Sequence, residues 1–213
     1  MPELSIIDQI WNTAAAISLL EWVATILSIS YVILAAKGNP WCWPLGLLSV
    51  IITFMVYIRP DVRLYSEATL QVYYMVMSVY GWMAWTKKKD ETASSESLIS
   101  IQRWTIKQHL MAFGSGIVLL LLLGSFWSWM GGALPYVDAF TTAFSIIATY
   151  MVTQKIIENW IYWIVIDLVS VFINWERGLY LFAVLFAVYC IVAIFGFIEW
   201  RRKELKINRT HQF

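Results

Sequence analysis

The sequence predicts an all-α membrane protein with seven transmembrane helices, arranged as a 3+1+3 parallel repeat bundle. Three observations support this prediction: an apolar composition, seven apolar segments of nearly membrane-spanning length, and sequence similarity between the third and seventh segments. Of the 213 residues, 60% are hydrophobic and 14% are charged, and the mean hydropathy is +0.66. Soluble proteins contain about 25% charged residues, so this composition argues against a soluble domain.

The apolar segments are separated by short polar loops and by one longer polar stretch. A helix needs about 20 residues to cross the hydrocarbon core of a bilayer, which is about 30 Å thick. The seven segments cover residues 17–36, 41–58, 62–85, 108–130, 136–153, 157–174 and 178–200. The sequence KKKDETASSES follows the third segment and predicts a solvated linker.

The segments divide the chain into five regions. These are a first three-helix repeat, a cytoplasmic polar linker, a linker transmembrane helix, a second three-helix repeat and a basic cytoplasmic tail. Their predicted boundaries are 1–86, 87–107, 108–135, 136–200 and 201–213. Because three is an odd number, two directly joined repeats would have opposite orientations, and the linker helix restores a parallel arrangement.

Matching residues in the two halves support the repeat, since transporters are often duplicated bundles. The third segment contains six residues that recur in the seventh at one fixed offset: Leu64, Tyr65, Leu70, Tyr74, Gly81 and Trp85, matched by Leu179, Tyr180, Leu185, Tyr189, Gly196 and Trp200. The first and fifth segments share an acidic residue, a Thr and a Ser at equal spacing: Glu21, Thr25 and Ser28, matched by Asp138, Thr142 and Ser145. In the second and sixth segments we pair Trp43 with Trp163.

The distribution of Lys and Arg predicts the orientation, because positive residues near helix ends are retained in the cytoplasm. With a cytoplasmic C-terminus, all of the 15 Lys and Arg residues lie inside except Arg59, Arg63 and Arg177. The N-terminus is then outside, as seven spans require. The first residues carry no Lys or Arg and no cleavage site, so we expect no cleavable signal peptide. We expect a multi-pass protein of the bacterial inner membrane.

Polar residues gather on one face of two predicted helices. In the sixth segment Trp160, Trp163, Asp167, Ser170 and Asn174 fall within an arc of about 80°. A charged side chain in the middle of a bilayer costs about 3 kcal/mol, so such residues usually face a cavity or a partner. The third segment carries a second polar face, formed by Glu67, Gln71, Tyr74 and Ser78.

The two faces predict one substrate-binding site. Its candidate residues are Trp160, Trp163, Asp167, Asn174, Gln71, Tyr74, Glu67 and Ser78. The alternative is that these side chains form hydrogen bonds between helices, which contribute about 0.6 to 2 kcal/mol per pair. This alternative is favoured for the serines Ser28, Ser78, Ser145 and Ser170. We interpret the tryptophans at segment ends as interfacial anchors; they are Trp41, Trp43, Trp82, Trp85, Trp127, Trp129 and Trp200.

Aromatic faces beside a carboxylate suit a flat organic cation, which stacks on the rings and pairs with the acid. A phosphate ester would find no Lys or Arg at mid-membrane. The only histidines, His109 and His211, lie in no HExxH motif, and Cys42 and Cys190 lack a CxxC spacing. We therefore expect no enzymatic activity, no cofactor or metal, and no nucleic-acid partner.

Two stretches carry a resemblance to a known family: LQVYYMVMSVYGWMAW at 70–85, and ENWIYWIVIDLVS at 158–170, the latter preceded by AFSIIATYMVTQK. They resemble the Pnu vitamin transporters, full-length relatives of the SWEET sugar transporters, and the resemblance covers essentially the whole chain. It implies a 3+1+3 fold, a homotrimer, and facilitated diffusion with trapping by a cytoplasmic vitamin kinase. It also implies a central site with Trp160 and Trp163 of WxxW, Gln71 and Tyr74 of QxxY, and Asp167.

At two positions the chain departs from the nicotinamide riboside branch of that family (PnuC type), which commonly has Asn where this chain has Ser78 and Asp167. A carboxamide pairs well with Asn or Gln, whereas an aminopyrimidine pairs well with a carboxylate. The thiamine branch (PnuT type) is therefore narrowly favoured, with nicotinamide riboside as the alternative. A non-transporting membrane receptor or scaffold is the alternative of another class.

Overall fold

The computed structural model describes residues 5–59, 65–87, 101–131 and 134–210, without the side chains of 65–67 and 208–210. In these ranges the chain forms eight α-helices and no strand longer than one bridge. The helices are α1 (Ile6–Ala16), α2 (Leu19–Ala36), α3 (Cys42–Tyr57), α4 (Tyr65–Thr86), α5 (Ile106–Trp129), α6 (Pro135–Thr153), α7 (Asn159–Glu176) and α8 (Tyr180–Thr210). The predicted all-α fold is confirmed.

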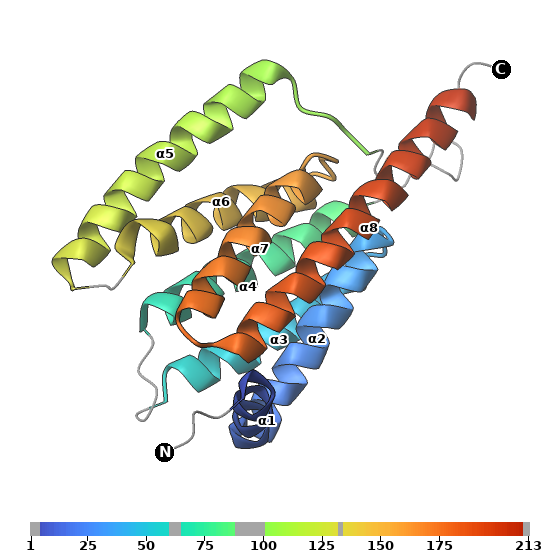
Figure 1. Ribbon diagram of the computed structural model, residues 1–213. Helices are drawn as coiled ribbons and strands as arrows, with labels where there is room; N and C mark the ends of the chain where they lie inside the picture. Colours follow the sequence, from blue (N-terminus) through green and yellow to red (C-terminus); the bar gives the residue numbers. More distant parts are fainter. Residues whose placement is uncertain (1–4, 60–64, 88–100, 132–133, 211–213) are drawn as a thin grey trace.

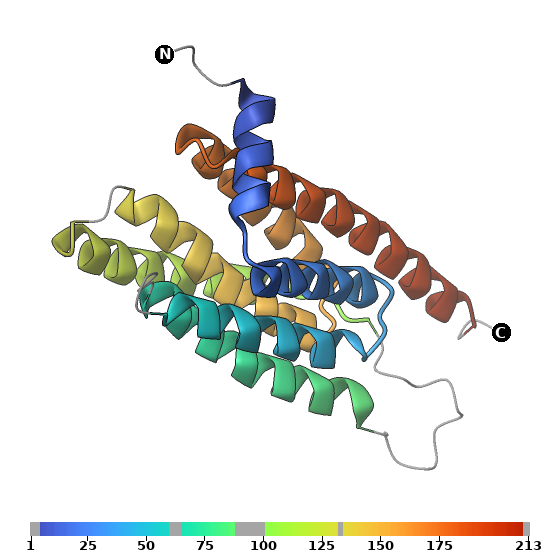
Figure 2. The same cartoon turned by 90° about the horizontal axis from the view of Figure 1, so that it is seen from below.

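The seven predicted segments correspond to α2 through α8, and α1 is an additional helix. Its sequence, IIDQIWNTAAA, has 11 residues, too few to cross a bilayer, so apolar length did not mark it as a segment. It lies across the end of the bundle and contacts α8 (Figures 1 and 2). At the other terminus, α8 continues to Thr210, beyond the predicted end at residue 200.

Local sequence features explain where several helices begin and end. A capping box starts α2: the Ser18 hydroxyl accepts a hydrogen bond from the Glu21 amide, and the Glu21 carboxylate accepts one from the Ser18 amide at 2.7 Å. Directly after the C-cap of α2, Gly38 takes a left-handed conformation with φ of 69°. Lys155 occupies the same position after α6, with φ of 52°.

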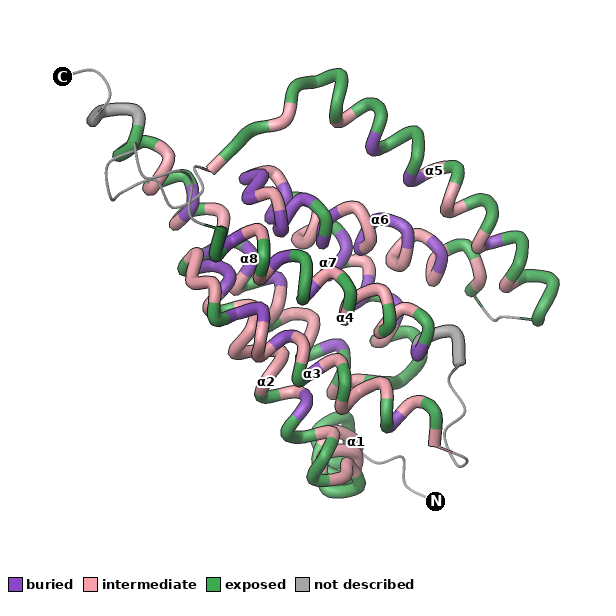
Figure 3. Tube along the Cα trace, turned by 180° about the vertical axis from the view of Figure 1, so that it is seen from behind, coloured by how far each residue is buried: buried purple, intermediate pink, exposed green. Residues whose placement is uncertain are grey.

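Six helices form a closed ring. Around it, α2 contacts α3, α3 contacts α4, α4 contacts α6, α6 contacts α7, α7 contacts α8, and α8 contacts α2. Helix α5 lies outside this ring and packs along α6 (Figure 1). The burial pattern agrees, since α6 carries many buried residues and α5 is mostly exposed (Figure 3).

Three helices are both long and apolar enough to cross a membrane by themselves: α2, α5 and the Tyr180–Ile207 part of α8. Helix α3 is apolar but shorter. The remaining ring helices carry polar residues that are buried in the bundle, such as Ser78, Thr149 and Asp167. These residues lower the mean hydropathy of helices that otherwise have an apolar surface.

One end of the bundle is rich in Lys and Arg, and we call it the basic end. It contains the α2–α3 loop, the α6–α7 loop and the C-terminal part of α8. Lys203 of α8 donates a hydrogen bond to the Lys37 carbonyl of the α2–α3 loop. Arg103, which precedes α5, pairs with Glu204 at 2.5 Å and with Glu158 at 3.6 Å.

Four tryptophans form a buried layer near the basic end, which we call the tryptophan layer: Trp43, Trp85, Trp160 and Trp200. Each is at most 2% exposed. The interpretation of Trp43, Trp85 and Trp200 as interfacial anchors is therefore wrong. Their rings pack on one another instead, with centroid distances of 5.4 Å for Trp43–Trp85 and for Trp160–Trp200, and 6.0 Å for Trp85–Trp200.

Candidate functional site

The helix ring encloses a cavity of about 520 Å³. Residues of α2, α3, α4, α6, α7 and α8 line it, and no described residue of α5 does. Protein cavities that bind small molecules typically measure about 300 to 1,000 Å³. The cavity therefore has a size that suits a vitamin-sized solute, and it lies at the interface of the six ring helices.

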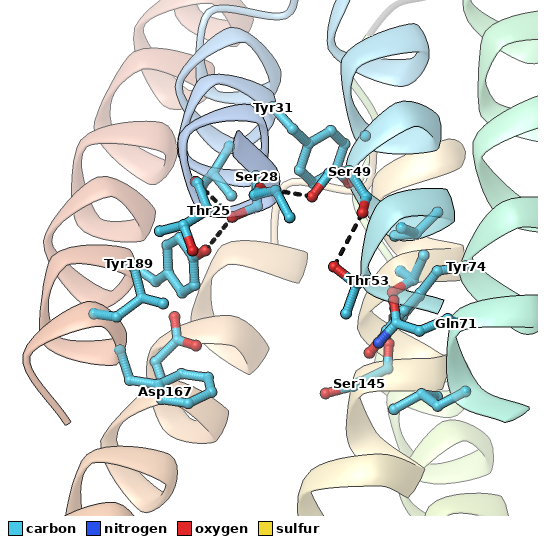
Figure 4. A pocket seen from close by; sticks show the side chains of 18 of the residues that line it. Thr25, Ser28, Tyr31, Ser49, Thr53, Gln71, Tyr74, Ser145, Asp167 and Tyr189 are labelled. Carbon is cyan, nitrogen blue, oxygen red and sulfur yellow. Dashed lines mark hydrogen bonds between the residues drawn. The ribbon is translucent and has the colours of Figure 1, made fainter. Parts of the chain in front are cut away.

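A buried carboxylate dominates one wall of the cavity. Asp167 of α7 is 3% exposed and points toward the central space (Figure 4). Among the described residues, the Asp167 carboxylate has no hydrogen-bond or ion-pair partner. Beside it, the Tyr189 and Ser28 hydroxyls form a hydrogen bond of 2.5 Å that joins α8 to α2. The wall thus combines an unpaired acid with a fixed hydroxyl pair.

The facing wall carries an amide and further hydroxyls. Gln71 and Tyr74 of α4 lie beside Ser145 of α6 in Figure 4. Helix α3 adds Ser49, whose hydroxyl donates to the Ala24 carbonyl at 2.8 Å, and Thr53, whose hydroxyl donates to the Ser49 carbonyl at 3.0 Å. Donors and acceptors therefore surround the cavity on several sides, as recognition of a polar solute requires.

Aromatic rings complete the lining. Trp163 of α7 is partly buried and borders the cavity, as do Tyr31, Tyr57 and Phe186. Aromatic faces stack on flat rings and attract cations through their negative faces. The Asp167 carboxylate, several hydroxyls and these rings together provide an environment for a flat solute with one positive charge and hydroxyl groups.

The structure brings most of the predicted site residues together. Six of the eight line the cavity: Gln71, Tyr74, Ser78, Trp160, Trp163 and Asp167. Asn174 does not line it, because its side-chain amide donates to the Ser170 carbonyl one turn earlier on α7. Glu67 lies in α4, and its side chain is outside the described residues.

Sequence reasoning did not assign the cavity residues of α3 or Tyr189 of α8 to the site. The repeat could have identified Tyr189 as a site residue, since it matches the predicted site residue Tyr74 in the alignment of the third and seventh segments. In the structure, Tyr189 faces Ser28 and Tyr74 faces Ser145, so each tyrosine meets the equivalent serine of the other half.

The tryptophan layer corrects one predicted pairing between the halves. A Cβ atom on Gly81 would lie 2.4 Å from the Trp43 ring, and one on Gly196 would lie 2.7 Å from the Trp160 ring. Since Gly81 and Gly196 are equivalent, the counterpart of Trp43 is Trp160. The pairing of Trp43 with Trp163 is wrong, because Trp163 lies about one helical turn further along α7.

The model of the nicotinamide mononucleotide transporter family matches residues 18–202, which include α2 to α7 and α8 as far as residue 202. The chain belongs to this family. Among curated relatives, the riboflavin/roseoflavin transporter RibM of Streptomyces davaonensis is 25% identical over 89% of this chain and 87% of its own length. The nicotinamide riboside transporter PnuC of Escherichia coli is 23% identical over 86% of this chain and 85% of its own length.

Two further matches agree with these. The nicotinamide riboside transporter PnuC of Neisseria mucosa is 27% identical over 87% of this chain and 73% of its own length. A crystal structure of the vitamin B3 transporter PnuC superposes with a TM-score of 0.70, at 23% identity, over 94% of this chain and 90% of that one. The fold is therefore that of PnuC.

These matches decide two earlier predictions. The predicted membership of the Pnu family is confirmed, and the chain is a membrane transporter rather than an enzyme. The narrow preference for thiamine is not supported, because these relatives are named for nicotinamide riboside and riboflavin. The Asp167 carboxylate does not distinguish thiamine from nicotinamide riboside, since a flat cation of either kind can pair with it.

Proposed function

We propose that this transporter carries a flat, positively charged B-vitamin across the membrane, and that nicotinamide riboside is its substrate. The observation that carries this proposal is Asp167, a buried carboxylate in the wall of an aromatic cavity, with no cationic partner among the described residues. The pyridinium ring of nicotinamide riboside supplies the missing charge, and its ribose supplies hydroxyls for the polar walls. The PnuC relatives support the same substrate.

Riboflavin is the second candidate. The RibM relative, with alignment over most of both chains, favours it. Riboflavin has a flat aromatic ring system and a hydroxylated chain, but it carries no positive charge at neutral pH. A neutral solute would gain no charge-assisted hydrogen bond from the Asp167 carboxylate, so we place riboflavin after nicotinamide riboside.

We further propose the 3+1+3 arrangement, with α2–α4 in the first repeat, α5 as the linker helix and α6–α8 in the second repeat, within the boundaries 1–86, 87–107, 108–135, 136–200 and 201–213. The closed ring of α2–α4 and α6–α8, with α5 outside, supports it. So do the equivalent contacts of Gly81 with Trp43 and of Gly196 with Trp160.

The basic end is proposed to face the cytoplasm, because Lys and Arg residues are retained there. The N-terminus is then outside and the C-terminus inside a bacterial inner membrane. As the resemblance to the Pnu family implies, transport would proceed by facilitated diffusion, and a cytoplasmic kinase would trap the vitamin by phosphorylation. The homotrimer stays a prediction of the same resemblance.

Titration of the purified protein tests the substrate. The 13 tryptophans provide a fluorescence signal, and three of them, Trp43, Trp160 and Trp163, border the cavity. We expect nicotinamide riboside to quench this fluorescence at lower concentration than riboflavin or thiamine does. Tighter binding of either competitor would refute the proposed substrate.

Uptake into liposomes tests transport itself. Reconstituted protein should equilibrate labelled nicotinamide riboside across the bilayer at a rate above that of empty vesicles. A non-transporting receptor would bind the vitamin and give no flux, so binding without flux would contradict the proposal and favour the receptor class.

A further inference from the structure

The tryptophan layer separates the cavity from the basic end of the bundle. Trp43 and Trp160 border the cavity, and the layer forms one buried cluster with Cys42 and Ile157 on the side of the loops. In the opposite direction the cavity extends past Glu21, in the first turn of α2, to Ile17, directly after α1. The cavity is therefore closed by the tryptophan layer at the basic end and extends toward the other end of the bundle.

Two hydrogen bonds, donated by the equivalent indoles of Trp85 and Trp200, hold the two halves of the ring together at this layer. The Trp85 indole donates to the Thr153 carbonyl at 3.1 Å and joins α4 to α6. The Trp200 indole donates to the Ala35 carbonyl at 3.1 Å and joins α8 to α2. These are the two places where the ring passes from α2–α4 to α6–α8, so the halves cannot separate here without breaking both bonds.

The other two indoles of the layer are unsatisfied. The Nε1 atoms of Trp43 and Trp160 are buried and have no hydrogen-bond partner among the described residues. A buried donor without a partner destabilises the conformation that contains it. The closed layer therefore contains an unsatisfied buried donor at two equivalent positions.

Lys155 reaches the layer from a strained backbone position. Its φ of 52° is the left-handed conformation that Gly38 adopts, with φ of 69°, at the equivalent position after α2. Such a conformation is unfavourable for a residue with a Cβ atom, and strain of this kind gathers at functional sites. The Lys155 ammonium lies 4.4 Å from the centroid of the Trp85 ring, and the residue is 7% exposed.

We propose that the tryptophan layer is the gate at the basic end of the transport path. The two indole hydrogen bonds hold it closed, and the Lys155 ammonium holds the Trp85 ring in place. For the gate to open, α4 must separate from α6 and α8 from α2 at this end. That the gate lies on a transport path rests on the proposed function, but the opening of the layer can be measured without any vitamin.

Cys42 provides a native reporter of that opening. It is fully buried, it lies beside Trp43 in the same cluster, and Cys190 is the only other cysteine of the chain. In a Cys190→Ser background, the rate at which a water-soluble maleimide modifies Cys42 measures how often the layer opens. We expect slow modification of this parent protein.

Removing one indole donor while keeping an aromatic ring should increase this rate. Loss of one neutral hydrogen bond corresponds to about three- to tenfold more of the open form, so Trp85→Phe and Trp200→Phe should each react about three- to tenfold faster. The matched control is Trp22→Phe, which removes an indole bond of 3.3 Å to the Ala14 carbonyl at the opposite end. Its rate should equal that of the parent.

Lys155→Gly separates a gating role from a merely structural one. Glycine relieves the backbone strain, so the thermal stability should not fall, yet the loss of the ammonium should accelerate the modification of Cys42. If Trp85→Phe does not fold, Trp200→Phe tests the equivalent bond. Parental rates in the folded Trp200→Phe and Lys155→Gly proteins would overturn the gate.

The two proposals can fail separately. If nicotinamide riboside does not bind but Cys42 responds as described, the substrate is wrong and the gate stands. If the vitamin binds and Cys42 does not respond in any variant, the substrate stands and the gate is wrong.

Discussion

The substitution Asp167→Asn tests the charge of the substrate, because it removes the buried carboxylate that Figure 4 shows pointing into the cavity while keeping the size of the side chain. Asp167 is 3% exposed, so solvent screens its interaction with a bound cation only weakly. A hydrogen bond to a charged group contributes about 1.5 to 3 kcal/mol. Since about 1.4 kcal/mol is a factor of ten, the affinity for nicotinamide riboside should fall about 10- to 100-fold.

The control is Asp138→Asn, the same chemical change outside the cavity lining. Asp138 pairs with Arg177 at 2.9 Å, and its side chain is 38% exposed. Fluorescence titration should give wild-type affinity for this variant. The reasoning is refuted if Asp167→Asn binds the cation as tightly as the wild type, or if neutral riboflavin loses as much affinity as nicotinamide riboside.

Three further predictions concern the walls and the layer. Tyr189→Phe removes the hydroxyl that bonds Ser28 at 2.5 Å, so thermal unfolding should show a loss of about 0.5 to 1.5 kcal/mol. Gly196→Ala inserts a methyl group 2.7 Å from a ring of the tryptophan layer and should lower stability by about 1 to 3 kcal/mol, whereas Gly114→Ala, with no atom within 4 Å, should not. Burial lowers the pKa of Lys155 from 10.5 to about 8. Between pH 8 and pH 10.5 the Lys155 amine is therefore protonated in the unfolded chain and neutral in the folded one, so the unfolding free energy should rise with pH across that window. Lys155→Met should abolish this rise in thermal melts.

The helical segments and their polar faces could be predicted from the sequence because both depend on local order along the chain. Apolar length marks a span, and a period of 3.6 residues places Gln71 and Tyr74, or Trp163 and Asp167, on one face. The structure then brings both faces to one cavity. A site whose residues lie on one face of each helix can thus be predicted from the sequence, without knowledge of how the helices pack.

The contacts between helices could not be predicted in the same way. Trp43 and Trp200 stand at segment ends, where an indole usually anchors in the interface, and only packing shows that they are buried. The α3 lining was missed because Ser49 and Thr53 are isolated polar residues in an apolar helix. Likewise, the left-handed conformation of Lys155 follows from its equivalence to Gly38, which requires the correct superposition of the halves.

That superposition shows that the framework of the cavity is symmetric while its charge is not. Val50 of α3 and Asp167 of α7 are separated by the same number of residues as Trp43 and Trp160, so they occupy equivalent positions in the two halves. Both line the cavity. The first half therefore has an apolar residue where the second has its carboxylate, so the positive end of the substrate should lie against α7.

Moving the charge to the equivalent position tests this orientation. If the two halves present equivalent positions to one cavity, Val50→Asp in the Asp167→Asn background should recover part of the lost affinity, by at least about threefold, with the cation bound near α3. Val50→Asn in the same background is the uncharged control and should recover none. Equal affinities of the two double variants would show that position 50 cannot replace position 167, and that the walls of the cavity are not equivalent toward the substrate.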